Sequence, residues 1–432
     1  MQKRVNFILG LAFLMLWLTG CGKAENSHIA NETESMGTET AQTSVQEENV
    51  KIITPAVVPE PLEKSDSKDA MSENVGTEDG ELQPLTVEEK EQQEMEIWIE
   101  NRIADMSLED QVAQLFIVGN YLGLDLSVYP VGGLIYFESD LQDPDQTRQM
   151  LQTAKDRSLS AVGVTVFTTV DEEGGSVTRV AGNPAFELAD PGNMVDLGGT
   201  GDTNLVRVTL EEVGTYLSGL GFNTDFAPVA DVYTDISNYY TKLRAFSNDP
   251  QIAADMVKAA VQGLHDGGVC TAVKHFPGLG YTSEDSHEER TITTRTLKEM
   301  QQWELLPFQA AIDAGTDFVM VGHVTAENVD ESGLPATMSS VMVNEILREQ
   351  MGYDGIVVTD AMNMGAIVNR YSSGEAAVQA LLAGVDMILM PADFESAYYA
   401  VLDAVQNGTI SEERLHASLG RILKVKYKMK TD

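Results

Sequence analysis

The sequence predicts an α/β protein: a single (β/α)8 barrel of the TIM type, preceded by a disordered stalk. The first observation behind this prediction is a set of eight short apolar runs that alternate with longer amphipathic stretches. Runs that are apolar throughout are typical of parallel strands covered on both faces. Eight such units in roughly 340 residues match the size of a TIM barrel. The runs are Gln114–Gly119, Gly133–Phe137, Thr165–Val170, Asn223–Pro228, Thr271–His275, Phe318–His323, Gly355–Asp360 and Asp386–Pro391.

The second observation is that polar residues gather at the carboxyl ends of these runs. In a parallel barrel all these ends meet on one rim, where catalytic groups lie in essentially every characterised enzyme of this fold. Burying an unpaired charge is costly, so six such ends favour one shared site. A doubly wound open sheet, which also alternates strands and helices, is the alternative fold. The polar ends are Asp171 to Gly175, Asp231, Lys274 with His275, His323, Asp360 and Asp393.

The helical stretches are predicted from capping signals and from apolar spacing. A helix is expected from Thr86 to Met106, and the segment from Ser107 to Asp110 resembles the capping start of a second helix. The amphipathic stretches lie between apolar runs, as a βα repeat requires. They predict helices at Asn204–Leu220, Ile252–Gly267, Leu297–Ala314 and Ser340–Met351.

The composition excludes several classes of function. The chain has 432 residues, with 28 Lys and Arg against 67 Asp and Glu, and a formal net charge of −39. DNA, RNA and anionic lipid headgroups need a basic footprint, so none of them is expected as a partner. The two cysteines, Cys21 and Cys270, are too few for a disulfide framework or a cysteine-rich metal site.

Residues 1–20 are typical of a secretory signal peptide. Lys3 and Arg4 precede an apolar run, Phe7–Leu18, that is shorter than the ~20 residues needed to cross a bilayer. The sequence Leu-Thr-Gly-Cys, which ends at Cys21, resembles a bacterial lipoprotein cleavage box. This resemblance implies cleavage before Cys21 and a diacylglyceryl group on its sulfur, and two acyl chains are enough for stable anchoring. A plain signal peptide with an accidental cysteine is the alternative.

Residues 21–88 are expected to form an acidic, disordered linker that begins at the lipidated Cys21. From Gly22 to about Leu85 the chain is rich in Glu, Ser, Thr and Pro and has no aromatic residue. Such a composition cannot bury enough apolar surface to offset the entropy lost on ordering. The catalytic barrel is therefore assigned to residues 89–432.

Short polar motifs recur in the barrel region, and several of them overlap the ends of the apolar runs. Together they resemble the signature of glycoside hydrolase family 3, in its β-N-acetylglucosaminidase branch, over about residues 100–428. Six ordered motifs are a far more specific signal than any one of them. They are Asp171-Glu-Glu-Gly-Gly with Arg179, Asp225-Phe-Ala-Pro-Val-Ala-Asp231, Arg244-Ala-Phe-Ser, Lys274-His-Phe-Pro-Gly-Leu-Gly280 followed by Asp285-Ser-His287, Gly322-His-Val324 and Thr359-Asp-Ala-Met-Asn-Met364.

The resemblance implies a pair of catalytic groups. Cleavage of a glycosidic bond with retention needs a carboxylate nucleophile and a proton donor near the leaving oxygen. The resemblance makes Asp360 the nucleophile that forms a glycosyl-enzyme intermediate. An N-cap of the following helix is the alternative role for this residue.

The same resemblance makes His287 the acid/base and Asp285 the carboxylate that orients it. Many relatives place a glutamate for this step on a second domain, whereas this chain ends at Asp432, so the barrel loops are expected to supply the group. A carboxylate can fix the tautomer of an imidazole, and histidine titrates near the working pH. A surface loop with an incidental histidine is the alternative.

The remaining motif residues resemble sugar-binding groups. Asp171 is expected to accept hydrogen bonds from sugar hydroxyls, and bonds to charged groups are worth ~1.5–3 kcal/mol each. A buried ion pair for Lys274 and a surface salt bridge for Arg244 are the structural alternatives, and the first is compatible with binding. The expected lining of the N-acetylglucosamine subsite is Arg179, Arg244, Lys274 and His275.

Three positions depart from the family pattern. Leu279 stands where a second histidine is usual, which predicts a looser loop around His287. Ser176 replaces a common arginine, and Ala361 replaces the second acid of a frequent Asp-Asp pair. None of these changes removes a residue to which chemistry is assigned.

The function expected from this resemblance is that of a retaining exo-β-N-acetylglucosaminidase acting on peptidoglycan fragments or related glycans. No metal or organic cofactor is implied, and a monomer on the outer face of the cell membrane, held only by its lipid, is expected. Three alternatives stay open: a β-glucosidase or β-xylosidase of the same family, a glycoside phosphorylase, and a lipoprotein that binds wall sugars without cleaving them.

Overall fold

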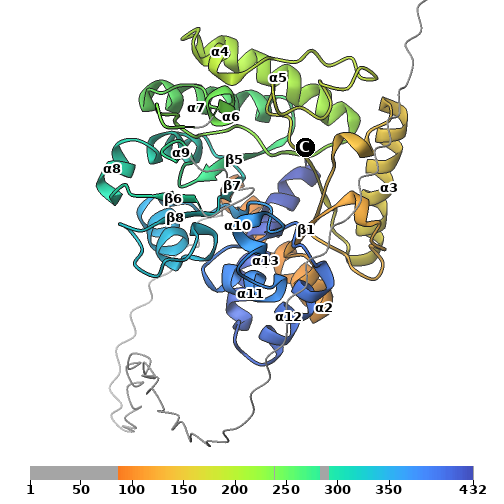
Figure 1. Ribbon diagram of the computed structural model, residues 1–432. Coiled ribbons are helices and arrows are strands. Elements are labelled where there is room, and N and C mark those ends of the chain that lie inside the picture. Colours follow the sequence, from red (N-terminus) through yellow and green to blue (C-terminus); the bar gives the residue numbers. More distant parts are fainter. Residues whose placement is uncertain (1–85, 238, 283–290, 432) are drawn as a thin grey trace, which may run out of the picture. The chain divides into compact units, whose positions relative to one another are not determined.

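Eight parallel strands stand at the centre of the computed structural model, which describes residues 86–237, 239–282 and 291–431 (Figure 1). Seven of the eight apolar runs contain one of these strands, the run Thr271–His275 lies within the longer β5, and each strand is almost wholly buried. The strands are β1 (Phe116–Gly119), β2 (Gly133–Ile135), β3 (Phe167–Val170), β4 (Thr224–Asp225), β5 (Cys270–Phe276), β7 (Phe318–Val321), β9 (Ile356–Thr359) and β10 (Ile388–Leu389).

The sheet closes on itself. Its strand order is β10-β1-β2-β3-β4-β5-β7-β9, and every pairing is parallel. Backbone bonds join the two outer strands of that order: the N–H of Thr359 donates to the carbonyl of Met387 at 3.0 Å, and the N–H of Asp386 donates to that of Val357 at 2.8 Å. The (β/α)8 prediction is therefore confirmed, and the open doubly wound sheet is wrong.

Two capped helices lead into the barrel. Helix α1 (Val87–Asp105) begins with a capping box between Thr86 and Glu89, and α2 (Leu108–Ala113) begins with one between Ser107 and Asp110. Each box satisfies backbone N–H groups that a helix start leaves without partners. Both helix starts agree with the sequence prediction.

A ring of helices surrounds the strands (Figure 1). The predicted helix at Asn204–Leu220 corresponds to α5, and the one at Ile252–Gly267 corresponds to α7. The helices of the ring and its shorter companions are α3 (Pro144–Val162), α4 (Met194–Gly198), α5 (Thr203–Leu220), α6 (Tyr239–Arg244), α7 (Pro250–Asp266), α8 (Leu297–Gln302), α9 (Leu305–Asp313), η4 (Val341–Gln350), α10 (Gly365–Val368), α11 (Ser373–Leu382), α12 (Phe394–Gln406) and α13 (Glu412–Thr431).

The structure differs from the regular βα repeat in two places. Residues 120–132, all of them described, connect β1 to β2 through only the short 3-10 turn η1 (Asn120–Leu122), so the first unit lacks its helix. The helix predicted at Leu297–Ala314 is split into α8 and α9 at Trp303 and Glu304. Two further 3-10 turns, η2 (Glu138–Asp140) and η3 (Ala336–Met338), lie outside the ring, and a small parallel sheet pairs β6 (Thr291–Thr293) with β8 (Val324–Ala326).

Aromatic side chains fill part of the barrel interior. The ring of Phe318 lies edge-on to that of Phe167, with centroids 5.0 Å apart, and it also contacts Phe226. One cation reaches this region: Lys426 of α13 is 2% exposed, and its ammonium lies 4.9 Å from the centre of the Phe167 ring. Its Nζ donates to Oε1 of Gln114 at 2.7 Å. Within the described residues no helix has the length and apolar character that a membrane span needs.

Burial of Lys426 predicts a pH-dependent stability. Desolvation lowers the pKa of Lys426 to about 7, against about 10.4 in an unfolded chain. Between these values the unfolded chain holds a proton that the folded chain lacks, so the free energy of unfolding rises with pH, by up to about 1.4 kcal/mol per pH unit. Urea unfolding of Lys426→Met from pH 7 to 10 should lack this rise. Lys424→Met, at a half-exposed position of the same helix, should retain it; equal slopes in both variants would contradict the prediction.

Candidate active site

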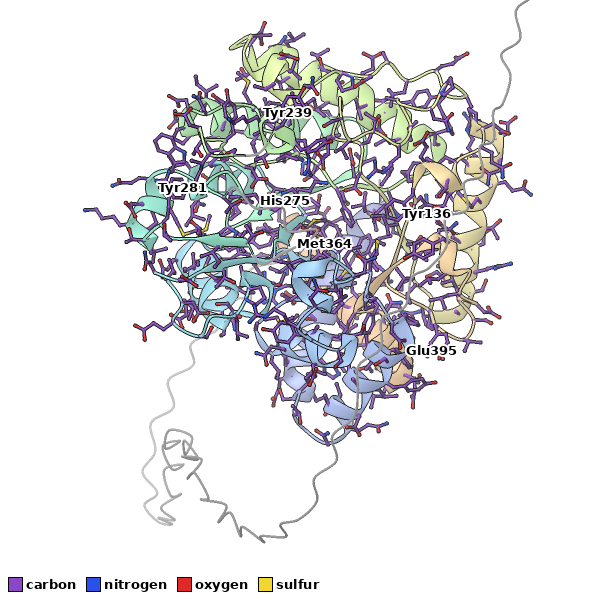
Figure 2. The ribbon with its side chains drawn as sticks, in the orientation of Figure 1. Tyr136, Tyr239, His275, Tyr281, Met364 and Glu395 are labelled. Atoms are coloured by element: carbon purple, nitrogen blue, oxygen red, sulfur yellow. The ribbon has the colours of Figure 1, made fainter. Side chains whose placement is uncertain are left out.

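A cavity of about 300 Å³ opens at the carboxyl ends of the barrel strands. The residues that line it come from six strands or the turns directly after them, and also from α6, which supplies Arg244. All six site residues predicted within the described chain are among them: Asp171, Arg179, Arg244, Lys274, His275 and Asp360. Figure 2 shows His275 and Met364, both in this lining, near the middle of the molecule.

The buried Lys274 and the partly buried Arg244 share one buried carboxylate at the cavity. Lys274 Nζ lies 2.5 Å from Oε1 of Glu173 and 2.7 Å from Oδ1 of Asp171. Arg244 binds Glu173 with both arms of its guanidinium, at 2.7 and 2.8 Å. The predicted ion pair of Lys274 is therefore present, and the partly buried Arg244 pairs with a buried acid rather than forming the surface salt bridge that was the alternative.

Mutual attraction keeps this network charged. Burial alone would raise the pKa of Glu173, but Arg244 and Lys274 outweigh that effect and hold its pKa well below the usual range. Burial would likewise lower the pKa of Lys274, yet the carboxylates of Asp171 and Glu173 raise it. The side chains therefore present fixed charges and oriented hydrogen-bonding groups to the cavity.

A second acid, Asp231, ties the cavity wall to the chain after β5. Its Oδ2 lies 2.9 Å from Nδ1 of His275, and its Oδ1 accepts the backbone N–H of Leu279 at 2.7 Å. The other ring nitrogen of His275 lies 3.3 Å from Arg244. Leu279, which departs from the family pattern, is thus held through its backbone, a contact that does not depend on its side chain.

Asp360 follows β9 and is half-buried at the cavity. Its backbone N–H donates to the carbonyl of Val321 at 2.8 Å, and its Oδ1 accepts the N–H of Ala361 at 2.7 Å. Burial would raise the pKa of Asp360, but His275, His323, the N–H of Ala361 and Lys274 together lower it. This carboxylate is therefore ionised at neutral pH. It does not cap the next helix, because the N-cap position of α10 is Met364.

Arg179 is positioned by the second acid of the Asp171-Glu-Glu motif. The carboxylate of Glu172 accepts three consecutive backbone N–H groups, from Arg179, Val180 and Ala181, at 2.7 to 3.0 Å. The guanidinium of Arg179 lies over the ring of Phe137, 5.8 Å from its centre, and 3.8 Å from Asp171. The apolar part of the cavity lining includes Met320, Met364, Leu389 and Met390.

Three residues of the predicted chemistry lie outside the described residues. These are the acid/base pair His287 and Asp285, and the lipidation site Cys21. The chain is described up to Thr282 and again from Thr291, so both flanks of the acid/base segment are placed.

The structure adds three residues to which the sequence analysis gave no role. Glu173 joins Lys274 to Arg244, Asp231 holds His275, and His323 contacts the carbonyl of Ala361 at 3.0 Å beside Asp360. All three stand in the motifs or strand ends that the sequence singled out. The sequence could not show which of the adjacent acids Glu172 and Glu173 faces the cations, because the two side chains have the same chemistry and differ only in direction.

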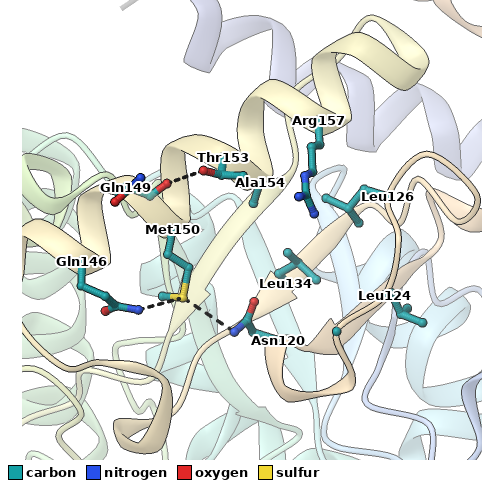
Figure 3. A pocket seen from close by; sticks show the side chains of 11 residues that line it. Asn120, Leu124, Leu126, Leu134, Gln146, Gln149, Met150, Thr153, Ala154 and Arg157 are labelled. Carbon is teal, nitrogen blue, oxygen red and sulfur yellow. Dashed lines mark hydrogen bonds between the residues drawn. The ribbon is translucent and has the colours of Figure 1, made fainter.

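A second cavity, of about 380 Å³, lies outside the strands, between α3 and the connection from β1 to β2 (Figure 3). It stands where the first unit lacks its helix. Asn120, Gln146 and Met150 line it, and none of the predicted site residues does. Among the described residues, no group of three or more His, Cys, Asp or Glu side chains is arranged to hold a metal ion.

Removing Glu173 should cost much more stability than removing an exposed acid. Glu173→Ala leaves the buried Lys274 and the partly buried Arg244 without their shared partner, and breaking a buried ion pair typically costs about 3–5 kcal/mol. Glu211 pairs with Arg207 on the surface at 3.8 Å, so Glu211→Ala should change the free energy of unfolding by less than about 1 kcal/mol. Urea unfolding at pH 7 measures both values. Similar losses in the two variants would show that the buried network does not hold the site together.

Comparison with known proteins places these motifs in a family. Residues 107–425 match the model of the glycosyl hydrolase family 3 N terminal domain. Beta-hexosaminidase A of Pseudoalteromonas piscicida is 33% identical over 331 residues, which are 70% of this chain and 54% of that protein. A beta-hexosaminidase of Chromobacterium violaceum is 34% identical over 268 residues, 60% of this chain and 71% of that protein.

A solved structure gives the same result. The family 3 beta-N-acetylglucosaminidase of Paenibacillus sp. str. FPU-7 superposes with a TM-score of 0.71 at 36% identity, over 76% of this chain and 63% of that one. The chain spans little more than half the length of the first curated relatives that it matches. The match nevertheless covers the whole barrel, and the chain belongs to glycoside hydrolase family 3.

Proposed function

We propose that the protein is a retaining exo-β-N-acetylglucosaminidase that removes terminal non-reducing N-acetylglucosamine from peptidoglycan fragments or related glycans. One observation supports this most strongly: an ionised carboxylate, Asp360, lines a small cavity beside a buried network of acids and cations. A volume of about 300 Å³ is at the lower end for ligand pockets and favours a single sugar residue. The relatives named as beta-hexosaminidases support the choice of sugar.

In the first step Asp360 attacks the anomeric carbon of the bound sugar. The bond to the leaving oxygen breaks as His287 donates its proton to that oxygen, and a glycosyl ester forms on Asp360. Lys274, Arg244 and Asp171 are assigned to the sugar hydroxyls, since charged partners strengthen hydrogen bonds. Because the ion pairs already hold these side chains in place, little reorganisation is needed when the sugar binds.

In the second step water attacks the same carbon from the other side. His287, now neutral, takes a proton from that water, and the ester bond to Asp360 breaks. Asp285 orients the imidazole in both steps. The two inversions at one carbon give net retention of configuration.

Replacement of Asp360 should abolish turnover. The purified protein is expected to release chromophore from an aryl N-acetyl-β-glucosaminide, and Asp360→Asn should lower kcat by about 10³-fold or more. Asp393→Asn is the matched control, because Asp393 follows β10 near the same rim but caps α12 through the N–H of Ser396. An inactive wild-type protein would favour the binding lipoprotein, and an active Asp360→Asn variant would contradict the assigned nucleophile.

His287→Ala should show the kinetic pattern of a lost acid/base. A dinitrophenyl leaving group departs without a proton, so kcat/KM on that substrate should fall little, whereas kcat/KM on the disaccharide chitobiose should fall by about 10²-fold or more.

Aryl glucosides and xylosides measured in parallel test the alternative sugars. Formation of glycosyl phosphate in phosphate buffer would show that the protein is a glycoside phosphorylase rather than a hydrolase.

Attachment to the outer face of the cell membrane through Cys21 is part of the same proposal. Residues 22–85 would then tether the barrel and let it reach the wall above the membrane. An alkyne fatty acid fed to expressing cells should label the wild-type chain and leave Cys21→Ser unlabelled. An unlabelled wild-type protein in the culture medium would contradict the anchor.

A further inference from the structure

Four side chains between the end of β5 and the start of α9 form a cluster: Tyr281, Arg295, Trp303 and Glu304. The guanidinium of Arg295 lies 4.2 Å from the centre of the Tyr281 ring and 5.3 Å from that of Trp303. Its Nε lies 2.8 Å from Oε1 of Glu304, whose side chain is only 3% exposed. Figure 2 shows Tyr281 well away from His275, so this cluster does not belong to the wall of the cavity.

The cluster joins two parts of the chain that flank the same short segment. Tyr281 stands just before residues 283–290, and Arg295 stands just after them. Both parts are also fixed to the barrel. The carbonyl of Gly280 accepts the hydroxyl of Thr234 at 2.8 Å, and the carbonyl of Thr294 accepts the side-chain amide of Asn328 at 2.5 Å.

Glu304 also contacts the chain at the end of β5. A Cβ atom on Gly278 would lie 2.8 Å from Cβ and Cγ of Glu304, so only a glycine allows this approach. Gly278 has φ +123°, which glycine adopts without strain. The break between α8 and α9 falls at Trp303 and Glu304, and these are the two residues of that break that Arg295 contacts.

We propose that Arg295 is a positioning residue for the acid/base step: stacked on Tyr281 and paired with Glu304, it holds together the described residues on either side of positions 283–290. The inference rests on the proposed function, because Asp285 and His287 stand in that segment. Arg295 touches no reacting atom. It acts through its contacts with the described flanks of Asp285 and His287, and a displacement of 1 Å at a catalytic group costs about 10²-fold in rate.

The kinetic pattern separates positioning from a general structural role. Arg295→Met should lower kcat/KM on chitobiose about 10- to 100-fold and leave kcat/KM on the dinitrophenyl substrate within about threefold. On the dinitrophenyl substrate kcat and KM should fall together. Without a well-placed base the attack of water on the glycosyl-enzyme is slow, so this intermediate accumulates. Azide attacks that intermediate without needing a base, so it should restore kcat.

Three further variants examine the stacking contact. Tyr281→Phe keeps the ring under the guanidinium and should behave as the wild type, whereas Tyr281→Ala should show the pattern of Arg295→Met. Arg295→Lys keeps the charge but loses the planar stack, so its loss of kcat/KM on chitobiose should be intermediate.

The Arg295→Met chain should still fold. Burial raises the pKa of Glu304 to about 7, and without Arg295 to oppose this effect the carboxyl takes up a proton.

The chain contains a matched control at the opposite end of the barrel. Arg348 is also stacked on a tyrosine, Tyr353, and paired with a buried acid, Asp386, whose Oδ2 accepts the N–H of Val357 near the start of β9. Arg348→Met should lower activity equally on both substrates, in proportion to the folded fraction. If Arg295→Met behaves in the same way, the positioning role is overturned.

His287→Ala and Asp360→Asn, measured alongside, distinguish failure of this inference from failure of the proposed function. If His287→Ala shows the leaving-group pattern and Arg295→Met does not, Arg295 has no positioning role. If Asp360→Asn stays active, or if His287→Ala lacks the pattern, the proposed chemistry itself fails.

Discussion

The sharing of Glu173 by Lys274 and Arg244 is the interaction on which the rest of the site depends. A buried lysine costs several kcal/mol without a partner, and a partly buried arginine beside it adds to that cost. One carboxylate, assisted by Asp171, offsets both costs and holds the two side chains at fixed positions beside the cavity. The geometry of the charged wall is therefore set by folding, before any ligand arrives.

The barrel brings these groups together from distant parts of the sequence. Asp171 and Glu173 follow β3, Arg244 ends a short helix after β4, and Lys274 lies within β5. Closure of the sheet through β9 and β10 then sets Asp360 in the lining of the same cavity. A parallel sheet that closes delivers all its carboxyl ends to one rim, so distance along the chain matters little.

Much of this could be predicted from the sequence because burial leaves a clear pattern. Strands covered on both faces must be apolar throughout, and all eight were located in this way. The sequence predicted eight regular βα units but named no helix at residues 120–132, where the structure has only a short 3-10 turn. The break at Trp303 and Glu304 was also missed, because the amphipathic pattern continues across it while Glu304 is buried against Gly278.

The sequence predicted which residues lie at the site more completely than it predicted the contacts between them. Lys274 and Arg244 were expected beside the sugar, but their common partner was hidden among three consecutive acids whose directions depend on the backbone. Glu172 turns away to bind the N–H groups of the Arg179 turn, and Glu173 turns toward the cations. Sequence gives the chemistry of such neighbours, whereas φ and ψ decide which of them faces the cavity.

Mass spectrometry of a trapped intermediate tests the central claim most directly. A slowly hydrolysed 5-fluoro analogue of N-acetylglucosaminyl fluoride should label the protein once, and peptide mapping should place the sugar on Asp360. A label on another carboxylate, or turnover with inversion and no label, would contradict the assignment of Asp360 as the nucleophile of a retaining hydrolase.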